Sequence, residues 1–424
     1  MEAFVISGGK SLRGEILVRG AKNAALPILA ATLLSRECSV IDNIPLIEDV
    51  KKFLDILSTL NVKVEWLGKR KVKIDPRHLN LKNLDQSLVK KLRASVLLIA
   101  PLAHRVQKFK LAQPGGCLIG VRSISTHLDA IQQLGMKVRR TPLFYYYNAS
   151  HLHTGEVTLG EFSVTATENI LMLAAATLGK TTLKIAALEP QIEDLITVLE
   201  KMGAKIKTKT PHIYEIEGHK KLKGIKHRII PDPIEAGTFM IMGATLRSHI
   251  LIKDVQLSHL ALVIKKLQKI GVRMQFQKKN HSLCDVLILP SFNLNGVNIQ
   301  TQPYPGIPTD LQSPFGVLAT QTTGTSIIFD TMFEGRLKYI DMLIKMGANA
   351  IIADPHRALI TGPTALYGQD INSLDIRSGI SLLIAALLAK GTSTIRDAYQ
   401  VDRGYEAIDE RLRQLGADIK RVQL

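Results

Sequence analysis

The segment Pro114–Arg122 holds the densest set of reactive and anion-binding groups in the sequence. It reads Pro-Gly-Gly-Cys-Leu-Ile-Gly-Val-Arg, so Cys117 lies among glycines and five residues before Arg122. Glycines let backbone N–H groups approach a ligand closely, and a guanidinium binds a carboxylate or phosphate through paired hydrogen bonds. Cationic, amide-rich surroundings favour a reactive thiolate, whereas an apolar pocket leaves a cysteine inert. The sequence alone is consistent with a reactive Cys117 and with a buried structural one.

A second candidate site lies near the N-terminus, in the segment Gly20-Ala21-Lys22-Asn23-Ala24-Ala25-Leu26-Pro27. This segment joins a predicted strand, Glu15–Val18, to an apolar helix. Lys22 and Asn23 are therefore expected at a helix N-terminus, where unpaired N–H groups and the helix dipole favour anions. Lys22 could bind a phosphate there, and the alternative is a solvated lysine in a turn.

A third candidate is Asp310, which follows two prolines and precedes an apolar helix in the segment Tyr304–Gln312. Aspartate at such a position is most often a helix N-cap. A carboxylate in a cleft can also accept a proton from a substrate hydroxyl. Both roles remain open for Asp310 at the level of sequence.

Three later segments place an arginine in a turn beside an acidic residue. They are Phe333-Glu334-Gly335-Arg336, Asp375-Ile376-Arg377 and Asp402-Arg403-Gly404-Tyr405-Glu406. Ion pairs at the surface are the simplest explanation of this pattern. A site for a multiply charged anion would require several of these arginines to converge in space.

These candidates are distributed over an internal repeat that organises the whole chain. Six times, a helix-like stretch ends in a turn and a strand follows at once. The turn residues are Asn61, Gly135, Gly203, Gly271, Gly347 and Gly416, which lie 74, 68, 68, 76 and 69 residues apart. Asn and Gly are the residue types that best adopt a left-handed helix C-terminus. Each unit also has an earlier apolar helix, such as Leu382–Ala389, expected to be buried, and a later amphipathic helix, such as Ile192–Glu200. We predict an α/β fold of six units, three in each of two domains.

The composition is consistent with an enzyme of a reducing compartment. The chain has 424 residues, more than one core usually supports. Cys38, Cys117 and Cys284 form no CxxC motif, so neither a disulfide framework nor a cysteine zinc site is indicated. The N-terminus lacks the basic stretch and apolar core of a signal peptide, and the apolar runs are shorter than the roughly 20 residues of a membrane helix. We expect a cytoplasmic location and no membrane span.

The net charge of +18 has two possible explanations. A basic surface can bind nucleic acid or anionic lipid, or it can steer a multiply anionic small substrate. Lys and Arg are spread along the chain, and the short clusters Lys69–Lys73 and Lys220–Arg228 are interrupted by apolar residues. Aromatic residues do not interleave with these basic runs, as they do in single-strand-binding proteins. We therefore expect no nucleic-acid partner.

Taken together, these segments resemble the UDP-N-acetylglucosamine 1-carboxyvinyltransferase family of enolpyruvyl transferases. The resemblance covers nearly the whole chain, and its most specific segments are Gly20–Pro27, Pro114–Cys117, Leu188–Pro190, Pro305–Asp310 and Asp402–Glu406. It implies an inside-out α/β barrel fold with two similar domains of three units each. By resemblance, residues 22–230 form one domain, and residues 1–21 join 231–424 in the other, with the active site in the cleft between them.

The resemblance also implies the reaction and the residues that carry it out. The enolpyruvyl group of phosphoenolpyruvate would move to the 3-hydroxyl of UDP-N-acetylglucosamine with release of phosphate, the first committed step of peptidoglycan precursor synthesis. No metal or organic cofactor would be required. Lys22, Asn23, Arg122 and Arg403 match residues that bind phosphoenolpyruvate, and Lys22 also counts among the catalytic residues. Cys117 matches the acid that forms a covalent adduct and that fosfomycin alkylates, and Asp310 matches the candidate base.

Other positions match residues around the nucleotide sugar. Those expected to bind UDP-N-acetylglucosamine are Arg93, Arg122, Ser123, Ile124, Ser125, Thr126, Ser163, Val164, Asp310 and Met332. Arg336, Asp375 and Arg377 match further positions that line the cleft.

The chain departs from the family pattern near the nucleotide. Ser123–Thr126 lacks a proline and an acidic residue that are common in the family, Thr165 replaces a glycine, and Gln400 replaces a frequent histidine. Because these changes lie around the nucleotide, the resemblance defines the type of reaction more closely than the affinity for the nucleotide sugar or its identity. Two alternative functions remain open. One is a shikimate-pathway enolpyruvyl transferase, whose family lacks the Pro-Gly-Gly-Cys loop. The other is a non-catalytic paralogue that binds a UDP-sugar and regulates the pathway.

Overall fold

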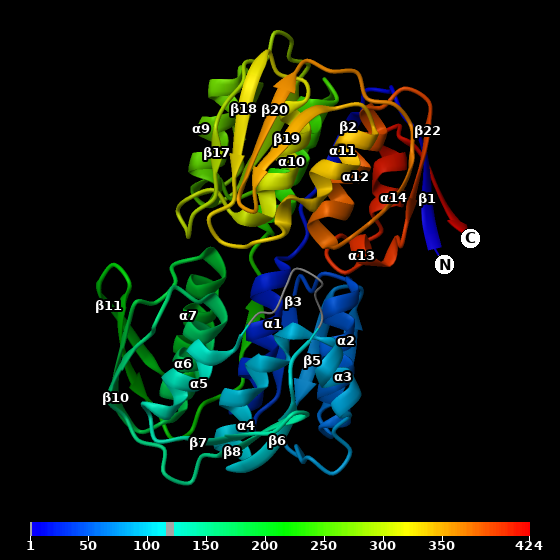
Figure 1. The fold of residues 1–424 in the computed structure, drawn as a ribbon. Helices are drawn as coiled ribbons and strands as arrows, with labels where there is room; N and C mark the ends of the chain where they lie inside the picture. The colour runs from blue at the N-terminus through cyan, green and yellow to red at the C-terminus, as the bar shows by residue number, and fades with distance from the viewer. Residues whose placement is uncertain (1, 116–122) are drawn as a thin grey trace. The chain divides into compact units, whose positions relative to one another are not determined.

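The computed structural model describes residues 2–115 and 123–424. The described residues form two compact units (Figure 1). The middle unit contains residues 20–115 and 123–230, and the terminal unit contains residues 2–19 and 231–424. Cys117 and Arg122 lie outside the described residues.

The same order of elements occurs three times in each unit, and each repeat contains the predicted turn. The six turn residues have positive φ: Asn61 at 59°, Gly135 at 85°, Gly203 at 117°, Gly271 at 102°, Gly347 at 106° and Gly416 at 93°. A strand begins two residues after each of them. The left-handed region is open to glycine and tolerable for asparagine, so the residue type fixes where each helix ends. The six predicted turns are confirmed.

Three apolar helices form the centre of the middle unit. They are α1 (Lys22–Ala31), α4 (Ile99–Arg105), which continues the 3-10 helix η2 (Arg93–Leu98), and α6 (Val164–Ala176). Amphipathic helices lie outside them: α2 (Glu48–Thr59), α5 (Ser125–Gln132) and α7 (Pro190–Met202), with the short α3 (Gln86–Lys91). The helix α6 packs against α4, α5 and α7. The predicted division into buried and amphipathic helices is therefore correct.

Three sheets cover the helices of the middle unit. The first sheet has the order β13 (Lys226–Arg228), β3 (Ser39–Asp42), β5 (Lys71–Asp75) and β4 (Lys63–Gly68). The second has the order β6 (Lys108–Ala112), β8 (Phe144–Asn148) and β7 (Lys137–Arg140). The third has the order β9 (Glu156–Thr158), β10 (Gly179–Lys184), β12 (Ile213–Gly218) and β11 (Lys205–Thr210).

The terminal unit has the same plan. Its central helices are α8 (Pro233–Thr245), α10 (Thr309–Ala319) and α12 (Ile376–Leu388), which pack against one another. The outer helices are α9 (Ala261–Ile270), α11 (Tyr339–Lys345) and α14 (Ile408–Gln414), with the short α13 (Tyr399–Asp402). Each central helix is buried along most of its length because it is enclosed by helices and sheet.

The sheets of the terminal unit include the first strands of the chain. One has the order β2 (Arg13–Leu17), β14 (His249–Val255), β16 (Cys284–Leu289) and β15 (Arg273–Lys278). Another has the order β17 (Ile299–Gln300), β18 (Gly324–Phe329), β20 (Arg357–Gly362) and β19 (Asn349–Asp354). The last has the order β21 (Asp370–Asn372), β22 (Thr392–Arg396), β1 (Glu2–Ser7) and β23 (Asp418–Gln423). Because β1 pairs with β23, the two chain ends lie side by side (Figure 1).

Each four-stranded sheet combines one parallel pair with antiparallel pairs. This mixed pairing and the enclosed helices confirm the predicted fold class, an α/β protein with three repeats in each of two similar bodies. In the described part of the chain, every helix is too short or too polar to cross a membrane.

Candidate active site

Asp310 is the centre of an ion cluster in the terminal unit. Its Oδ1 accepts a hydrogen bond from Arg336 Nη1 at 2.8 Å, and its Oδ2 accepts one from Arg377 Nη2 at 2.5 Å. The N-cap of α10 is Pro308, and Asp310 occupies the first turn without capping it. The helix-cap hypothesis for Asp310 is therefore wrong, because its carboxylate binds the two arginines instead.

The charges of this cluster keep Asp310 ionised. Burial alone would raise the pKa of Asp310, but the charges and hydrogen bonds of Arg377 and Arg336 outweigh burial and hold it well below the usual range. Arg377 in turn has a raised pKa, since attraction to Asp310 outweighs its own burial. Two cations thus share the Asp310 carboxylate, and the charge of Asp375 adds to the raised pKa of Arg377.

Local structure sets the positions of the two arginines. Arg377 lies in the first turn of α12, whose N-cap is Asp375 in a capping box with Ser378. Asp375 accepts hydrogen bonds from the N–H groups of Arg377 at 2.8 Å and Ser378 at 3.3 Å. Arg336 begins the 3-10 helix η4 (Arg336–Lys338), directly after Gly335, which has φ of 74°. The Nε of Arg336 is buried and has no hydrogen-bond partner in the described chain.

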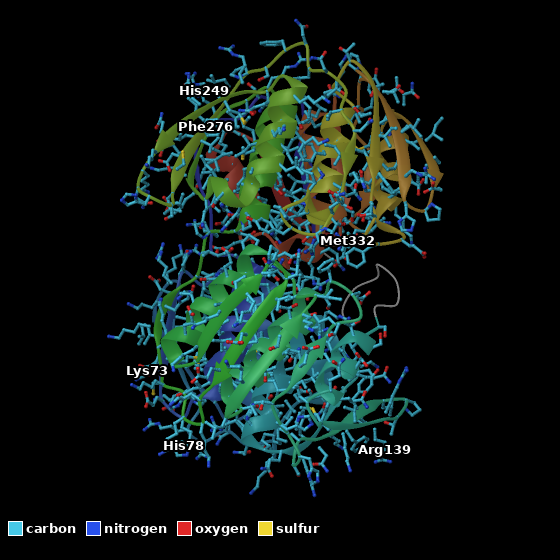
Figure 2. The ribbon with its side chains drawn as sticks, turned by 90° about the vertical axis from the view of Figure 1, so that its left-hand side faces the viewer. Lys73, His78, Arg139, His249, Phe276 and Met332 are labelled. Carbon is cyan, nitrogen blue, oxygen red and sulfur yellow. The ribbon has the colours of Figure 1, made fainter. Side chains whose placement is uncertain are left out.

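Asp330 organises the loop that precedes Arg336, and sequence reasoning missed it. It is fully buried at the end of β18 and accepts hydrogen bonds from Thr309 Oγ1 at 2.5 Å and Thr301 Oγ1 at 3.1 Å. It also accepts a hydrogen bond from the backbone N–H of Met332 at 2.9 Å. Met332, labelled in Figure 2, is thus fixed through its backbone by Asp330. An aspartate directly after an apolar strand was the available signal.

The residue after Arg403 packs against the helix that carries Arg377. A Cβ on the next residue, Gly404, would lie 2.5 Å from Ile376 Cγ2, so the backbone at Gly404 packs directly on the first turn of α12. Arg403 Nη1 donates a hydrogen bond to Gln400 Oε1 at 3.2 Å, and Gln400 Nε2 donates one to Asp397 at 3.1 Å. Gln400, a departure from the family pattern, therefore orients Arg403.

In the middle unit, Lys22 forms a buried ion pair. Lys22 is the first residue of α1, as predicted, and Asn23 follows it. Lys22 Nζ lies 2.6 Å from Asp49 Oδ2, and both side chains are largely buried. The solvated-lysine alternative is therefore wrong. Sequence reasoning missed Asp49, which is the second residue of α2.

The nucleotide candidates of the middle unit are connected by polar contacts. Arg93 Nη2 donates a hydrogen bond to the Ser123 carbonyl at 3.0 Å, and Thr126 Oγ1 donates one to Glu161 at 2.7 Å. Ile124 and Ser125 lie between them, at the start of α5. Ser163 caps α6, which begins at Val164. These contacts bring Arg93 to the start of α5.

Thr165, another departure from the family pattern, contacts a buried histidine. Its Oγ1 lies 3.0 Å from His127 Nε2, and Asn169 Nδ2 lies 3.4 Å from His127 Nδ1. Burial, with a contribution from the charge of Arg93, lowers the pKa of His127 to about 3. A neutral His127 thus joins the segment after Ser123 to the start of α6, and a glycine at position 165 would leave its ring nitrogen without this partner.

Comparison with known proteins gives the family. A family model described as EPSP synthase (3-phosphoshikimate 1-carboxyvinyltransferase) matches residues 6–412. The UDP-N-acetylglucosamine 1-carboxyvinyltransferase of Finegoldia magna is 38% identical over 425 residues, and 100% of each chain is covered. The protein of the same name from Halothermothrix orenii is 40% identical over 423 residues, again with 100% of each chain covered.

Solved structures share the fold. The enolpyruvyl transferase NikO from Streptomyces tendae superposes with a TM-score of 0.89 at 23% identity, covering 100% of this chain and 99% of its own. EPSP synthase from Acinetobacter baumannii superposes with a TM-score of 0.76 at 18% identity, and 100% of both chains is covered.

The six-repeat fold and the family model that matches residues 6–412 place the chain in the enolpyruvyl transferase class. Identity of 38–40% over the full length then decides among the members of that class. The chain belongs to the UDP-N-acetylglucosamine 1-carboxyvinyltransferase family.

Proposed function

We propose that this protein transfers the enolpyruvyl group of phosphoenolpyruvate to the 3-hydroxyl of UDP-N-acetylglucosamine and releases phosphate, the first committed step of peptidoglycan precursor synthesis. The observation that carries the proposal is the full-length similarity to relatives that bear the name of this reaction. The arginine cluster around Asp310 supports it, since the chemistry needs a group that accepts a proton and cations that bind anions.

In this proposal Asp310 accepts the proton of the sugar hydroxyl. An ionised carboxylate can do so only weakly while Arg336 and Arg377 hold it, because they stabilise its charged form. The arginines are the groups that an anionic substrate would engage. If the substrate draws either arginine away, the basicity of Asp310 rises when the hydroxyl is in place. Asp375 positions Arg377 through the capping box.

The anion-binding roles fall to Lys22, Asn23, Arg122 and Arg403, with Cys117 as the acid at the enolpyruvyl carbon. Lys22 is held by Asp49 and Arg403 by Gln400, so both cations are pre-positioned in the structure. Fixed charges stabilise a developing charge without reorganisation at the moment of reaction. Cys117 would form the covalent adduct and react with fosfomycin.

A further set of residues is proposed to contact the nucleotide sugar. The proposed set is Arg93, Arg122, Ser123, Ile124, Ser125, Thr126, Ser163, Val164, Asp310 and Met332. The observed bond between Arg93 and Ser123 supports a role for Arg93 in shaping this segment. We further propose that residues 22–230 form one functional domain and that residues 1–21 with 231–424 form the other.

The proposed setting is the cytoplasm, and the proposed partners are the two small substrates. The free thiols of Cys38 and Cys284 support the location, since disulfides are rare in reducing compartments.

The deciding experiment measures phosphate release from phosphoenolpyruvate with two alternative acceptors, UDP-N-acetylglucosamine and shikimate 3-phosphate. Turnover with the UDP-sugar alone is expected. Turnover with shikimate 3-phosphate alone would favour the enzyme for which the matching family model is named. Tight UDP-sugar binding without turnover would favour a regulatory paralogue.

A further inference from the structure

The outer face of the β6–β8–β7 sheet differs in its charge from the equivalent face in the third repeat of the middle unit. Cross-strand pairing places Lys110, Tyr146 and Arg139 in one row, and Lys108, Asn148 and Lys137 in the next. We call these six residues the basic row face. Residues paired directly across strands point to the same side of a sheet.

The opposite face of this sheet is the buried one. Phe109 and Tyr147 stack with their ring centroids 4.9 Å apart, and both are almost fully buried, as are Leu111 and Tyr145. The alternation of buried and exposed residues therefore leaves the basic row face outside. Arg139 is labelled in Figure 2, at the edge of the middle unit.

The four cations of this face have no carboxylate partner. Within the described residues, Lys108, Lys110, Lys137 and Arg139 take part in no ion pair, and all four are exposed. Arg139 instead lies over the ring of Tyr146 at 4.6 Å, and Lys110 lies over the ring of Phe144 at 4.8 Å.

The third repeat of the same unit provides an internal control. Its middle strand β12 has Glu215 and Glu217 at the positions that Tyr146 and Asn148 occupy in β8, as the registers show. There the flanking lysines are neutralised: Lys180 and Lys209 lie 3.2 and 3.1 Å from Glu215, and Lys205 lies 3.2 Å from Glu217. The same scaffold thus neutralises its cations in one repeat and leaves them unpaired in the other.

The shape of the basic row face fits an extended ligand. A shallow hollow of about 490 Å³ lies along it, lined by Lys108, Lys110, Lys137, Arg139, Tyr146 and Asn148 among others. Cations on the two outer strands flank a middle strand that offers an aromatic ring and an amide. Proteins that bind single strands combine a basic groove for the phosphates with aromatic side chains on which bases stack.

We propose that the basic row face binds single-stranded nucleic acid. The expectation that the protein has no such partner rested on the linear order of basic and aromatic residues, and pairing of the three strands produces a different order in space. A lipid surface fits less well, because the six residues of this face are four cations, a tyrosine and an asparagine, with no aliphatic side chain to insert among lipid tails. The only strongly exposed apolar side chain of the β7–β8 connection is Leu143, 65% exposed.

The test measures binding of the full-length protein to fluorescein-labelled oligouridylate of roughly 15 nucleotides, by fluorescence anisotropy at several salt concentrations. For the variant Lys110→Ala/Arg139→Ala, we expect affinity to fall at least about fivefold at low salt. The slope of log K against log salt should become shallower by about 1.4, since each phosphate contact with a single strand contributes about 0.7. Oligodeoxythymidylate of the same length distinguishes RNA from DNA.

The matched control is Lys265→Ala/Lys269→Ala on α9, which removes two exposed cations one helical turn apart and changes the net charge equally. This control should keep both affinity and slope. Equal losses in the two variants would mean that only the overall charge matters, and would overturn the proposal.

Two further variants test base stacking and the role of charge, and the second uses side chains that the equivalent strand of the third repeat already carries. Tyr146→Leu should weaken binding roughly tenfold with the salt slope unchanged, because a stacked base contributes without counterion release. Tyr146→Glu/Asn148→Glu copies the middle strand of the third repeat, which folds with glutamates at these positions, and should abolish binding. All variants should retain the transferase turnover of the unchanged protein, which shows that they are folded.

Competition identifies the class of ligand. Polyglutamate of equal charge should displace the oligonucleotide much less effectively than unlabelled oligouridylate, and equal displacement would overturn the proposal in favour of an acidic protein segment. Sedimentation with phosphatidylglycerol vesicles should show no binding that depends on Leu143. Vesicle binding that is lost in Leu143→Ser, with weak oligonucleotide binding, would overturn it in favour of a membrane surface.

Discussion

At the scale of single residues, the chemistry of Asp310 depends on its charge balance with two arginines. Its carboxylate is 26 and 67 residues from Arg336 and Arg377 in sequence, yet it binds both. A carboxylate held in this way is strongly acidic, so its usefulness as a base depends on a ligand that competes for the arginines.

Asp310→Asn is expected to reduce kcat by at least about a hundredfold, since an amide can hydrogen-bond but cannot accept the proton. The same change leaves two largely buried arginines uncompensated, and we expect a loss of about 3 kcal/mol in the free energy of unfolding. Steady-state kinetics below the melting temperature and chemical denaturation measure the two effects. The control is Asp354→Asn, which breaks an exposed pair with Arg357 and should leave kcat unchanged. A kcat near that of the unchanged protein would refute the base role of Asp310.

His127 predicts a dependence of stability on pH. Its pKa is about 3 in the folded protein and 6.5 ordinarily, so the unfolded chain binds more protons between these values. Above pH 6.5, burial of the neutral ring therefore costs no stability. Between pH 6.5 and about 3, the free energy of unfolding falls by roughly 1.4 kcal/mol for each pH unit. Melting temperatures of the unchanged protein and of His127→Gln, measured across this range, should differ in slope. Parallel curves would show that His127 is not buried as a neutral ring.

At the scale of elements, the six turns determine where a helix ends and the next strand begins. Each turn ends a helix and begins a strand within two residues, and a positive φ is required for that. Other side chains would strain the turn whether or not space exists for them.

Gly203→Ala is expected to cost about 1–2 kcal/mol in the free energy of unfolding, because its φ of 117° disfavours a Cβ although the space is open. Gly347→Ala should cost more. Its added Cβ would also lie 3.1 Å from the Ala365 carbonyl and 3.3 Å from Tyr367. Asn61→Gly, at the equivalent turn, should change stability little. Urea denaturation of the three variants checks this order, and equal losses at 203 and 347 would contradict the crowding argument.

At the scale of the whole molecule, a buried ion pair joins segments from both ends of the chain. Glu235 in α8 accepts hydrogen bonds from Arg411 Nη1 at 2.6 Å and from the Arg19 N–H at 2.7 Å. Arg411 Nη2 also donates a hydrogen bond to the Leu17 carbonyl at 2.8 Å. The N-terminal segment is thereby fastened to two helices of the terminal unit.

Glu235→Gln should cost about 3–5 kcal/mol in the free energy of unfolding, since it leaves Arg411 buried without its counter-charge. The double variant Glu235→Gln/Arg411→Met should recover part of that loss. Glu15→Gln, which removes a solvent-exposed pair with Lys253, should have little effect. Thermal and urea denaturation measure all three, and a double variant no more stable than Glu235→Gln would contradict the assigned pairing.

The sequence by itself determined the repeat, its turns and the family. These features are local: a left-handed turn needs Gly or Asn, a buried helix needs apolar residues on all sides, and short motifs such as Gly20–Pro27 are contiguous. The positions of Lys22 and Asn23 at a helix start followed from the same local chemistry, and α1 begins at Lys22.

Only the tertiary structure decided which charges meet. The pairing of Lys22 with Asp49, of Asp310 with Arg336 and Arg377, and of Thr165 with His127 joins residues far apart in sequence. The row of Lys110, Tyr146 and Arg139 likewise arises from the register of three strands. A side-chain contact across elements depends on packing and register, which no local pattern encodes, so the sequence could supply the candidates but could not say which of them were partners.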